Sequence, residues 1–403
     1  MKVFFSSILT SLLLFLFIDF FFGNKILNYL YSFDLIYSPL EAKNKQLEKE
    51  ENEKKYRIKN SYFHHTLKSN IKTKSFWGNS EYVTCTNSQG FRDSCDKKKV
   101  EDNSFQIIFI GDSFTEGLGI EYDKSFVGLY DKSSKNSVLN MAVSSYSPII
   151  YLKKIQYFLN KGLKIDSVIV FLDISDIDDE ANYYEQCQNN SNVCHQKEIM
   201  NLELKKEIMN LELNSLDSIK NENDFIFPLF NFIQVKLKEI KRIIKPKDYI
   251  YRKNFIRSEW THNNFEEYKE GLENSIKYMT ELSETLNKKD IKLSLAVYPH
   301  PATLIHDKKN SRHVKIWEDF CKNKCLNFIN LFPIFFDEIK NNNHMEIIKK
   351  YYIENDIHFN EAGNKKIFDI LKNYEFGAPD RSRTHNLRSR NPALYPVEAT
   401  GAM

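Results

Sequence analysis

Hydrophobic residues follow three successive patterns along this chain. The first is an almost unbroken apolar run from Val3 to Phe22, in which Asp19 is the one charged residue. About 20 apolar residues are needed for a helix to cross the hydrocarbon of a bilayer. Residues 1–23 are therefore predicted to be a transmembrane anchor. The run is long for a cleaved signal peptide and no small-x-small cleavage site follows Phe22, so an uncleaved anchor is favoured.

The second pattern has no apolar face and covers residues 24–60 and 61–104. Residues 26–40 mix aliphatic side chains with tyrosines, as expected near lipid headgroups. Residues 42–59 mix Glu and Lys at helical spacing, which predicts a solvated helical stalk. Residues 61–104 hold aromatics without a clear period and are interpreted as an ordered lead-in. Its His64–His65 pair is read as packing or surface histidine, with substrate contact as the alternative.

The third pattern begins at residue 105, where short apolar runs alternate with amphipathic segments. This alternation predicts a parallel sheet with helices on both faces, in a domain spanning residues 105–375. The strands are predicted at 106–110, 137–141, 167–172, 292–298 and 326–330, and the clearest helices at 148–163, 264–287, 314–322 and 361–372.

Residues 178–263 interrupt this alternation and are predicted to be a helical insertion. They contain a tandem repeat, Lys197–Leu204 and Lys206–Leu213, which has too few copies to form a solenoid. Residues 225–232 are aromatic-rich and residues 236–247 are basic. The insertion is expected over the active-site mouth or against the membrane, or as an ordinary packed helical insert.

The last residues, 376–403, differ in composition from the rest. They contain no lysine and are rich in arginine and proline, whereas lysine dominates the basic residues elsewhere. The segment resembles peptides made by translation through a transfer-RNA gene, so a foreign, disordered tail without function is expected.

The composition limits which binding partners the chain can have and indicates the cellular compartment in which it lies. A 42% hydrophobic and 14% aromatic content excludes full disorder, and the net charge of +3 comes from interspersed charges, which gives no basic field for nucleic acid. Six cysteines in three close pairs fit disulfides of an oxidising compartment, although the connectivity is open. The bulk of the chain is therefore placed on the extracytoplasmic, periplasmic side. The cysteines are Cys85, Cys95, Cys187, Cys194, Cys321 and Cys325.

Candidate chemistry begins at Gly111-Asp112-Ser113, between the strand predicted at 106–110 and a helical pattern. Ligands of open α/β sheets bind where strands end, and a helix N-terminus stabilises an oxyanion beside a serine hydroxyl. Taken alone, the tripeptide is ordinary turn chemistry.

A serine nucleophile needs a base and a group that orients the base, and Asp356-Ile357-His358 supplies both. Alternate residues of an extended loop point the same way, so Asp356 can hold His358. Asn360 is a natural N-cap for the helix that follows, which leaves the pair in the loop at the edge where Ser113 emerges.

With these two motifs, residues 105–372 resemble the SGNH/GDSL hydrolases. The resemblance implies a flavodoxin-like α/β/α sandwich with Ser113 as nucleophile, His358 as base and Asp356 as its orienting acid. The closest likeness is to membrane-anchored members associated with surface-polysaccharide modification. It rests on residues 86–92 (Thr-Asn-Ser-Gln-Gly-Phe-Arg), 140–148 (Asn-Met-Ala-Val-Ser-Ser-Tyr-Ser-Pro) and 298–301 (Tyr-Pro-His-Pro).

The chain departs from the family pattern at three places. Ser145 stands where a glycine usually donates its N–H to the oxyanion, and Ser175 stands where an asparagine is usual. The implied oxyanion hole is the N–H groups of Ser113 and Ser145 with the Ser175 hydroxyl. Losing one such donor costs about 3 kcal/mol of transition-state stabilisation. The last block is Asp-x-His rather than Asp-x-x-His, in which Asn355 takes the place of the acid; Asp356 is preferred.

Other polar residues receive weaker assignments. His300 follows a predicted strand and is expected either to line a sugar site or to be structural, and Asp112 is a second candidate for substrate binding. The acidic cluster lacks regular ligand spacing, so it is assigned to polar groups around the cleft, and no metal or cofactor is expected. The cluster consists of Asp173, Asp176, Asp178, Asp179 and Glu180.

These features predict a single-pass, membrane-anchored, extracytoplasmic serine esterase or acyltransferase acting on O-acetyl groups of a cell-surface polysaccharide. A lipid-directed esterase is the alternative suggested by the anchor and the aromatic insertion. A catalytically silent carbohydrate-binding scaffold is the alternative suggested by Ser145 and Ser175.

Overall fold

A five-stranded parallel sheet forms the core of the computed structural model. The structure describes residues 2–32, 56–77, 80–96, 104–182, 227–234, 248–263, 265–339 and 343–376. All five predicted strands are present, each within three residues of its expected ends. They are β5 (Ser104–Gly111), β6 (Val138–Asn140), β7 (Lys164–Leu172), β8 (Lys292–Val297) and β9 (Asn327–Asn330), in the order β6-β5-β7-β8-β9.

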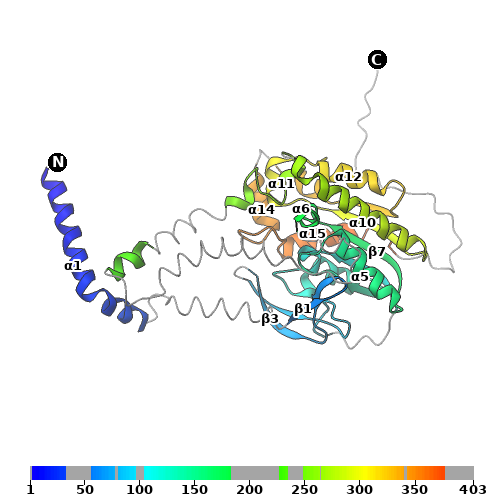
Figure 1. Cartoon of the computed structure of the whole chain (residues 1–403), viewed down its shortest axis with the longest axis horizontal. Helices are drawn as coiled ribbons and strands as arrows, with labels where there is room; N and C mark the ends of the chain where they lie inside the picture. The colour runs from blue at the N-terminus through cyan, green and yellow to red at the C-terminus, as the bar shows by residue number, and fades with distance from the viewer. Residues whose placement is uncertain are drawn as a thin grey trace, which may run out of the picture.

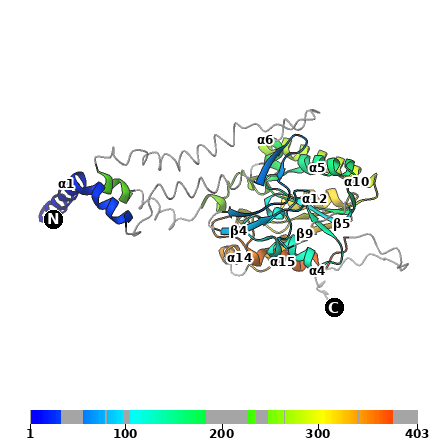
Figure 2. The ribbon, with the colours of Figure 1, turned by 90° about the horizontal axis from the view of Figure 1, so that it is seen from below.

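Helices cover both faces of this sheet because successive strand side chains point to opposite faces. Ile108 and Val170 pack in one hydrophobic cluster, whereas Phe109 and Phe171 pack in the other. Figure 2 shows α5 and α10 on one side of the strands and α4, α14 and α15 on the other. The α/β/α prediction is therefore confirmed.

The helices follow the apolar periodicity of the sequence, and the four predicted ones are present. The longer helices are α4 (Phe126–Ser133), α5 (Pro148–Asn160), α10 (Lys269–Asn287), α12 (Arg312–Cys321), α14 (His344–Tyr351) and α15 (Glu361–Leu371). The shorter ones are α3 (Ser113–Glu116), α6 (Asp176–Asn182), α11 (Pro301–His306) and α13 (Phe332–Phe336), with 3-10 turns at Tyr122–Lys124, Asp248–Tyr251, Glu259–Thr261 and Glu266–Tyr268.

The strand order places a binding position between β5 and β7. Numbered within the sheet, the order is 2-1-3-4-5, the flavodoxin-like arrangement, whose ligand site lies at the carboxyl ends of the first and third strands. Ser113 follows β5 and Asp173 follows β7, so both lie at this edge.

The end of the predicted stalk and the lead-in together form two antiparallel hairpins that the sequence pattern did not indicate. They are β1 (Arg57–Asn60) with β2 (His64–Leu67), and β3 (Lys72–Trp77) with β4 (Ser80–Cys85). The prediction of a helical stalk is wrong at its end, because Arg57 to Asn60 are extended and pair with β2. Buried Tyr56 and Phe63 anchor this hairpin in the main core, and such packing overrides local propensity.

A long helix, α1 (Lys2–Ser32), forms the N-terminus and continues past the predicted end of the anchor at residue 23. Its segment Ser6–Leu30 has a mean hydropathy of 1.9. This segment is long and apolar enough to be a membrane span or a signal sequence. Both ribbon views show α1 apart from the α/β domain, beside a short helix formed by residues 228–234 (Figures 1 and 2).

Two of the three close cysteine pairs are disulfides. Cys85 joins Cys95 and Cys321 joins Cys325, with Cα–Cα distances of 5.2 and 4.7 Å. Cys187 and Cys194 lie outside the described residues, as do the tandem repeat, the predicted stalk up to residue 55 and all but the first residue of the predicted foreign tail.

Candidate active site

The turn after β5 places Ser113 at the first position of α3. Gly111 is required there because a Cβ would lie 2.4 Å from the Thr115 Oγ1 atom and 2.8 Å from the Phe171 carbonyl oxygen. Asp112 is the N-cap, and its Oδ1 accepts a hydrogen bond from Phe114 N–H at 3.0 Å. The Gly-Asp-Ser sequence therefore builds a tight strand-to-helix turn that carries the serine at its tip.

Buried Arg92 secures the other end of α3. Its Nη1 donates to the carbonyl oxygens of Glu116 and Gly117 at 3.0 and 2.5 Å, and its Nη2 donates to that of Ile120. A cation favourably satisfies the last carbonyls of a helix. Residues 86–92, noted in the sequence without a role, thus deliver the guanidinium that holds α3.

Ser113, His358 and Asp356 form a continuous hydrogen-bonded chain. The Ser113 Oγ lies 2.8 Å from the His358 Nε2, and the His358 Nδ1 lies 2.5 Å from the Asp356 Oδ1. Asp356 also accepts the His358 backbone N–H at 2.9 Å, which fixes the loop. Asn355 adopts a φ of 57°, and in this structure its neighbour Asp356 takes the position of the acid.

His358 keeps the carboxyl of Asp356 ionised. Burial alone would raise the pKa of Asp356, but its electrostatic interaction and hydrogen bonds with His358 outweigh burial and hold the pKa below its usual range. A carboxyl with a depressed pKa is charged at neutral pH, and its contribution to stability is full above its unfolded pKa of about 4 and is lost progressively as the pH falls below that value. Asp356 can therefore orient His358 throughout the neutral range.

Trp77 of β3 completes the environment of the acid, and sequence reasoning missed it. Its Nε1–H donates to the Asp356 Oδ2 at 3.0 Å, and its ring meets the His358 ring edge-on at 4.9 Å between centroids. The two residues are separated by 279 positions, so no local motif links them.

Replacing Trp77 with phenylalanine should keep the ring and remove only the hydrogen bond. We expect kcat for ester hydrolysis to fall by about 10–100-fold with KM unchanged, since such a bond to a charged group contributes about 1.5–3 kcal/mol. Steady-state kinetics and a thermal melt check this. A loss confined to stability, with kcat retained, would contradict the positioning role.

The loop that carries Ser145 is held by residues of the hairpin formed by β1 and β2. The Ser144 N–H donates to Glu116 Oε2 at 2.6 Å, and Arg57 binds both oxygens of Glu116 at 2.9 and 3.1 Å. His65 Nε2–H donates to the Ser144 carbonyl oxygen at 2.7 Å. Burial lowers the pKa of His65 to about 3, so this histidine is neutral and acts in packing, as one of the two readings expected.

Ser145 itself adopts a φ of 64°, in the left-handed region that favours glycine, which accounts for the family pattern at this position. Ser113 N–H makes no hydrogen bond among the described residues, so it is available at the helix terminus.

Ser175 lies in the turn after β7, beside Asp173. Its backbone N–H donates to the Asp173 Oδ1 at 2.7 Å, which fixes the backbone of this turn. The oxyanion hole made by the N–H groups of Ser113 and Ser145 with the Ser175 hydroxyl stays a prediction.

His300 does not line an open sugar site. It is fully buried, its Nε2 lies 2.9 Å from the Asp173 Oδ2, and its ring stacks on Phe114. Burial would raise the pKa of Asp173, but the charge of His300 and its hydrogen bond hold it below its usual range. His300 was expected either to line a sugar site or to be structural, and its burial fits the structural role. Asp112 is also buried, and its Oδ2 accepts a hydrogen bond from the Ser113 hydroxyl at 3.1 Å.

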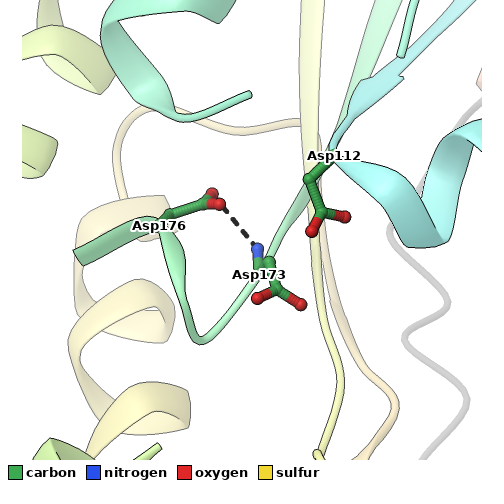
Figure 3. A group of neighbouring side chains, drawn as sticks. All are labelled: Asp112, Asp173 and Asp176. Carbon is green, nitrogen blue, oxygen red and sulfur yellow. Dashed lines mark hydrogen bonds between the residues drawn. The ribbon is translucent and has the colours of Figure 1, made fainter. Parts of the chain in front are cut away.

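Three carboxyl groups lie close together at the carboxyl ends of β5 and β7 (Figure 3). Oxygens of Asp112, Asp173 and Asp176 lie within 4.8 Å of one another, a grouping that could hold a cation. Burial first, and then the charge of Asp173, raise the pKa of Asp112 and of Asp176 well above its usual range. The absence of a metal from this cluster stays a prediction.

The remaining acidic residues are buried rather than arranged around a cleft. Asp179 pairs with Arg257 at 3.3 Å. Glu180 Oε1 accepts the Ser147 hydroxyl at 2.6 Å and the Ile149 N–H at 2.7 Å, so it caps α5. Burial raises the pKa of both Asp179 and Glu180 to about 7.

These raised values predict a pH dependence of stability. The folded state holds protons on Glu180 that the unfolded state releases, so the free energy of unfolding should fall as pH rises from about 4.5 to about 7. Glu180→Gln should reduce this fall by roughly 1–3 kcal/mol, measured by denaturant titration at pH 5 and pH 8. Glu284→Gln, on the exposed side of α10, is the control. Equal pH dependence in the two variants would contradict the raised value.

Comparison with known proteins finds only distantly similar solved structures. No family model matches the chain, and no curated protein matches it. Among solved structures, a psychrotrophic esterase EstA from Pseudoalteromonas is 11% identical, with 68% of this chain and 98% of that chain covered and a TM-score of 0.31. A GDSL-like lipase from Bacteroides thetaiotaomicron is 12% identical, with 69% and 90% covered and a TM-score of 0.33. At such scores the functional argument rests on the site itself.

Proposed function

We propose that this protein is a serine esterase of the SGNH/GDSL type, with Ser113 as nucleophile, His358 as base and Asp356 as orienting acid. The single observation that carries the proposal is the 2.8 Å contact between Ser113 Oγ and His358 Nε2, continued by the 2.5 Å contact between His358 and Asp356. Contacts of this length allow direct proton transfer from hydroxyl to imidazole.

The proposed reaction has two halves. Ser113 Oγ attacks the ester carbonyl while its proton passes to His358 Nε2, and the oxyanion is stabilised by the N–H groups of Ser113 and Ser145. His358 then protonates the leaving alcohol, which leaves an acyl-Ser113. Water releases the acid in hydrolysis, and a second alcohol takes the acyl group in transfer; His358 removes the proton of either acceptor.

The proposed location is the extracytoplasmic face of a membrane, and the proposed substrate is an O-acetylated cell-surface polysaccharide. The apolar helix α1 supports anchoring, and the two disulfides support an oxidising compartment. The likeness of the three middle motifs to enzymes of surface-polysaccharide modification supports the substrate class.

A lipid-directed esterase is the second candidate, because a segment of the insertion lies against α1. Activity of the full-length protein on p-nitrophenyl esters of increasing acyl length separates the two. The polysaccharide proposal expects kcat/KM to be highest for acetate and to fall by at least about tenfold at octanoate. A preference for octanoate would reject it in favour of the lipid-directed enzyme.

A further inference from the structure

Asp19, the charged residue within the apolar run of α1, is fully buried. Its Oδ1 accepts the backbone N–H of Leu229 and its Oδ2 accepts that of Phe230, both at 2.7 Å. These donors begin the short helix of residues 228–234, whose first N–H groups have no partner within their own helix. Asp19 is thus a cap supplied by one helix to another that lies far away in the sequence.

The contact is built into one stripe of α1. Asp19, Gly23 and Leu27 are buried at a spacing of four residues, which places them on one helix face. A Cβ on Gly23 would lie 2.2 Å from the Asp19 Oδ1 and 2.7 Å from the Pro228 Cγ, so only glycine permits this approach.

The rest of this helix pair exposes large apolar side chains. The apolar window of α1 is only 11% buried. On the short helix Phe230 and Ile233 are 36% and 41% exposed. Contiguous apolar surface of this kind marks a membrane or protein contact. On α1 the exposed residues include Leu9, Leu13, Phe17, Phe20 and Phe21.

We propose that residues 227–234 are embedded in the bilayer beside α1, as a second membrane contact held in place by Asp19. Hydrocarbon offers no water, so a carboxylate and the free N–H groups of a helix end are tolerated there only when they satisfy each other. In this pair both oxygens of Asp19 and two N–H groups are satisfied together. In water, solvent could satisfy the Asp19 carboxyl group and the two N–H groups separately.

The sequence limits how far this second contact extends. Asp224 and Lys236 bound the apolar stretch, which is too short to span a bilayer and must enter and leave on the same side. The insertion therefore returns the chain to the membrane that α1 anchors. This inference rests on the membrane location proposed above and not on the ester chemistry.

Labelling by a membrane-impermeant maleimide tests the embedding. Full-length Ile233→Cys and Ile256→Cys proteins are compared in phosphatidylcholine–phosphatidylglycerol liposomes, with the unsubstituted chain as background. Both isoleucines are exposed in the protein alone, at 41% and 56%, and Ile256 lies in the α/β domain. We expect Ile233→Cys to label at least about tenfold more slowly in liposomes, and equally after denaturation in SDS. Equal rates in liposomes would overturn the proposal.

The role of Asp19 is tested in the Ile233→Cys background. Asp19→Leu leaves both N–H groups uncapped and should raise labelling of the cysteine toward that of Ile256→Cys. Asn24→Leu, an exposed polar position on the same helix, is the control and should leave the protection intact. Protection that persists in Asp19→Leu would overturn the capping role, and so would a membrane-bound chain found by mass spectrometry to lack α1. Ester hydrolysis by the same samples reports the catalytic proposal separately.

Discussion

Replacing Ser113 with alanine should lower kcat for p-nitrophenyl acetate by at least about 10⁴-fold, the loss expected when the nucleophile of a triad is removed. The residual rate would come from the oxyanion donors and from binding. The change deletes one oxygen from a side chain that is 7% exposed, so the fold should survive.

Ser133→Ala is the matched control for this prediction. Ser133 is an exposed serine of α4 whose hydroxyl donates to the Tyr130 carbonyl oxygen, away from the triad. Its variant should keep full activity. Comparable rates for Ser113→Ala and Ser133→Ala, with both proteins folded by circular dichroism, would reject Ser113 as the nucleophile.

Replacing Asp356 with asparagine should cost about 10⁴-fold in kcat with KM nearly unchanged. An amide at this position would present an N–H to the His358 Nδ1 and favour the imidazole tautomer that cannot accept the serine proton. Asparagine keeps the shape of the side chain and can still accept the Trp77 Nε1–H, so this variant isolates the charge and the tautomer.

Asn355→Gly distinguishes the two candidate positions for the acid. Asn355 has a φ of 57°, which glycine adopts freely, so the backbone should be undisturbed. If Asp356 is the acid, Asn355→Gly retains activity within about threefold, as for other changes away from the reacting groups. A severe loss in Asn355→Gly with little loss in Asp356→Asn would place the orienting role at residue 355.

The sheet and the contacts among Ser113, His358 and Asp356 could be predicted from sequence because each rests on a local pattern. Buried parallel strands appear as short apolar runs, and the carboxyl ends of such strands share one edge. Ser113 and His358 could therefore be placed together although they are 245 residues apart. The position of Asp356 beside His358 could be predicted because alternate side chains of an extended loop point the same way.

The parts that sequence reasoning missed depend on contacts between distant segments. Trp77 and Arg57 lie on short hairpin strands without apolar periodicity, so neither their strands nor their partners could be deduced. The backbone N–H of Ser175 bonds to Asp173, a contact that only the folded turn reveals. His300 was assigned from its place after a strand, and burial decided its role.

The most direct test of the central claim is covalent labelling of the full-length protein by a fluorophosphonate, followed by mass spectrometry of the peptides. Such reagents require a serine activated by its base. The account predicts a single stoichiometric adduct on Ser113, absent from Ser113→Ala and formed far more slowly in Asp356→Asn. An adduct on another serine, or no adduct in the unsubstituted protein, would contradict it.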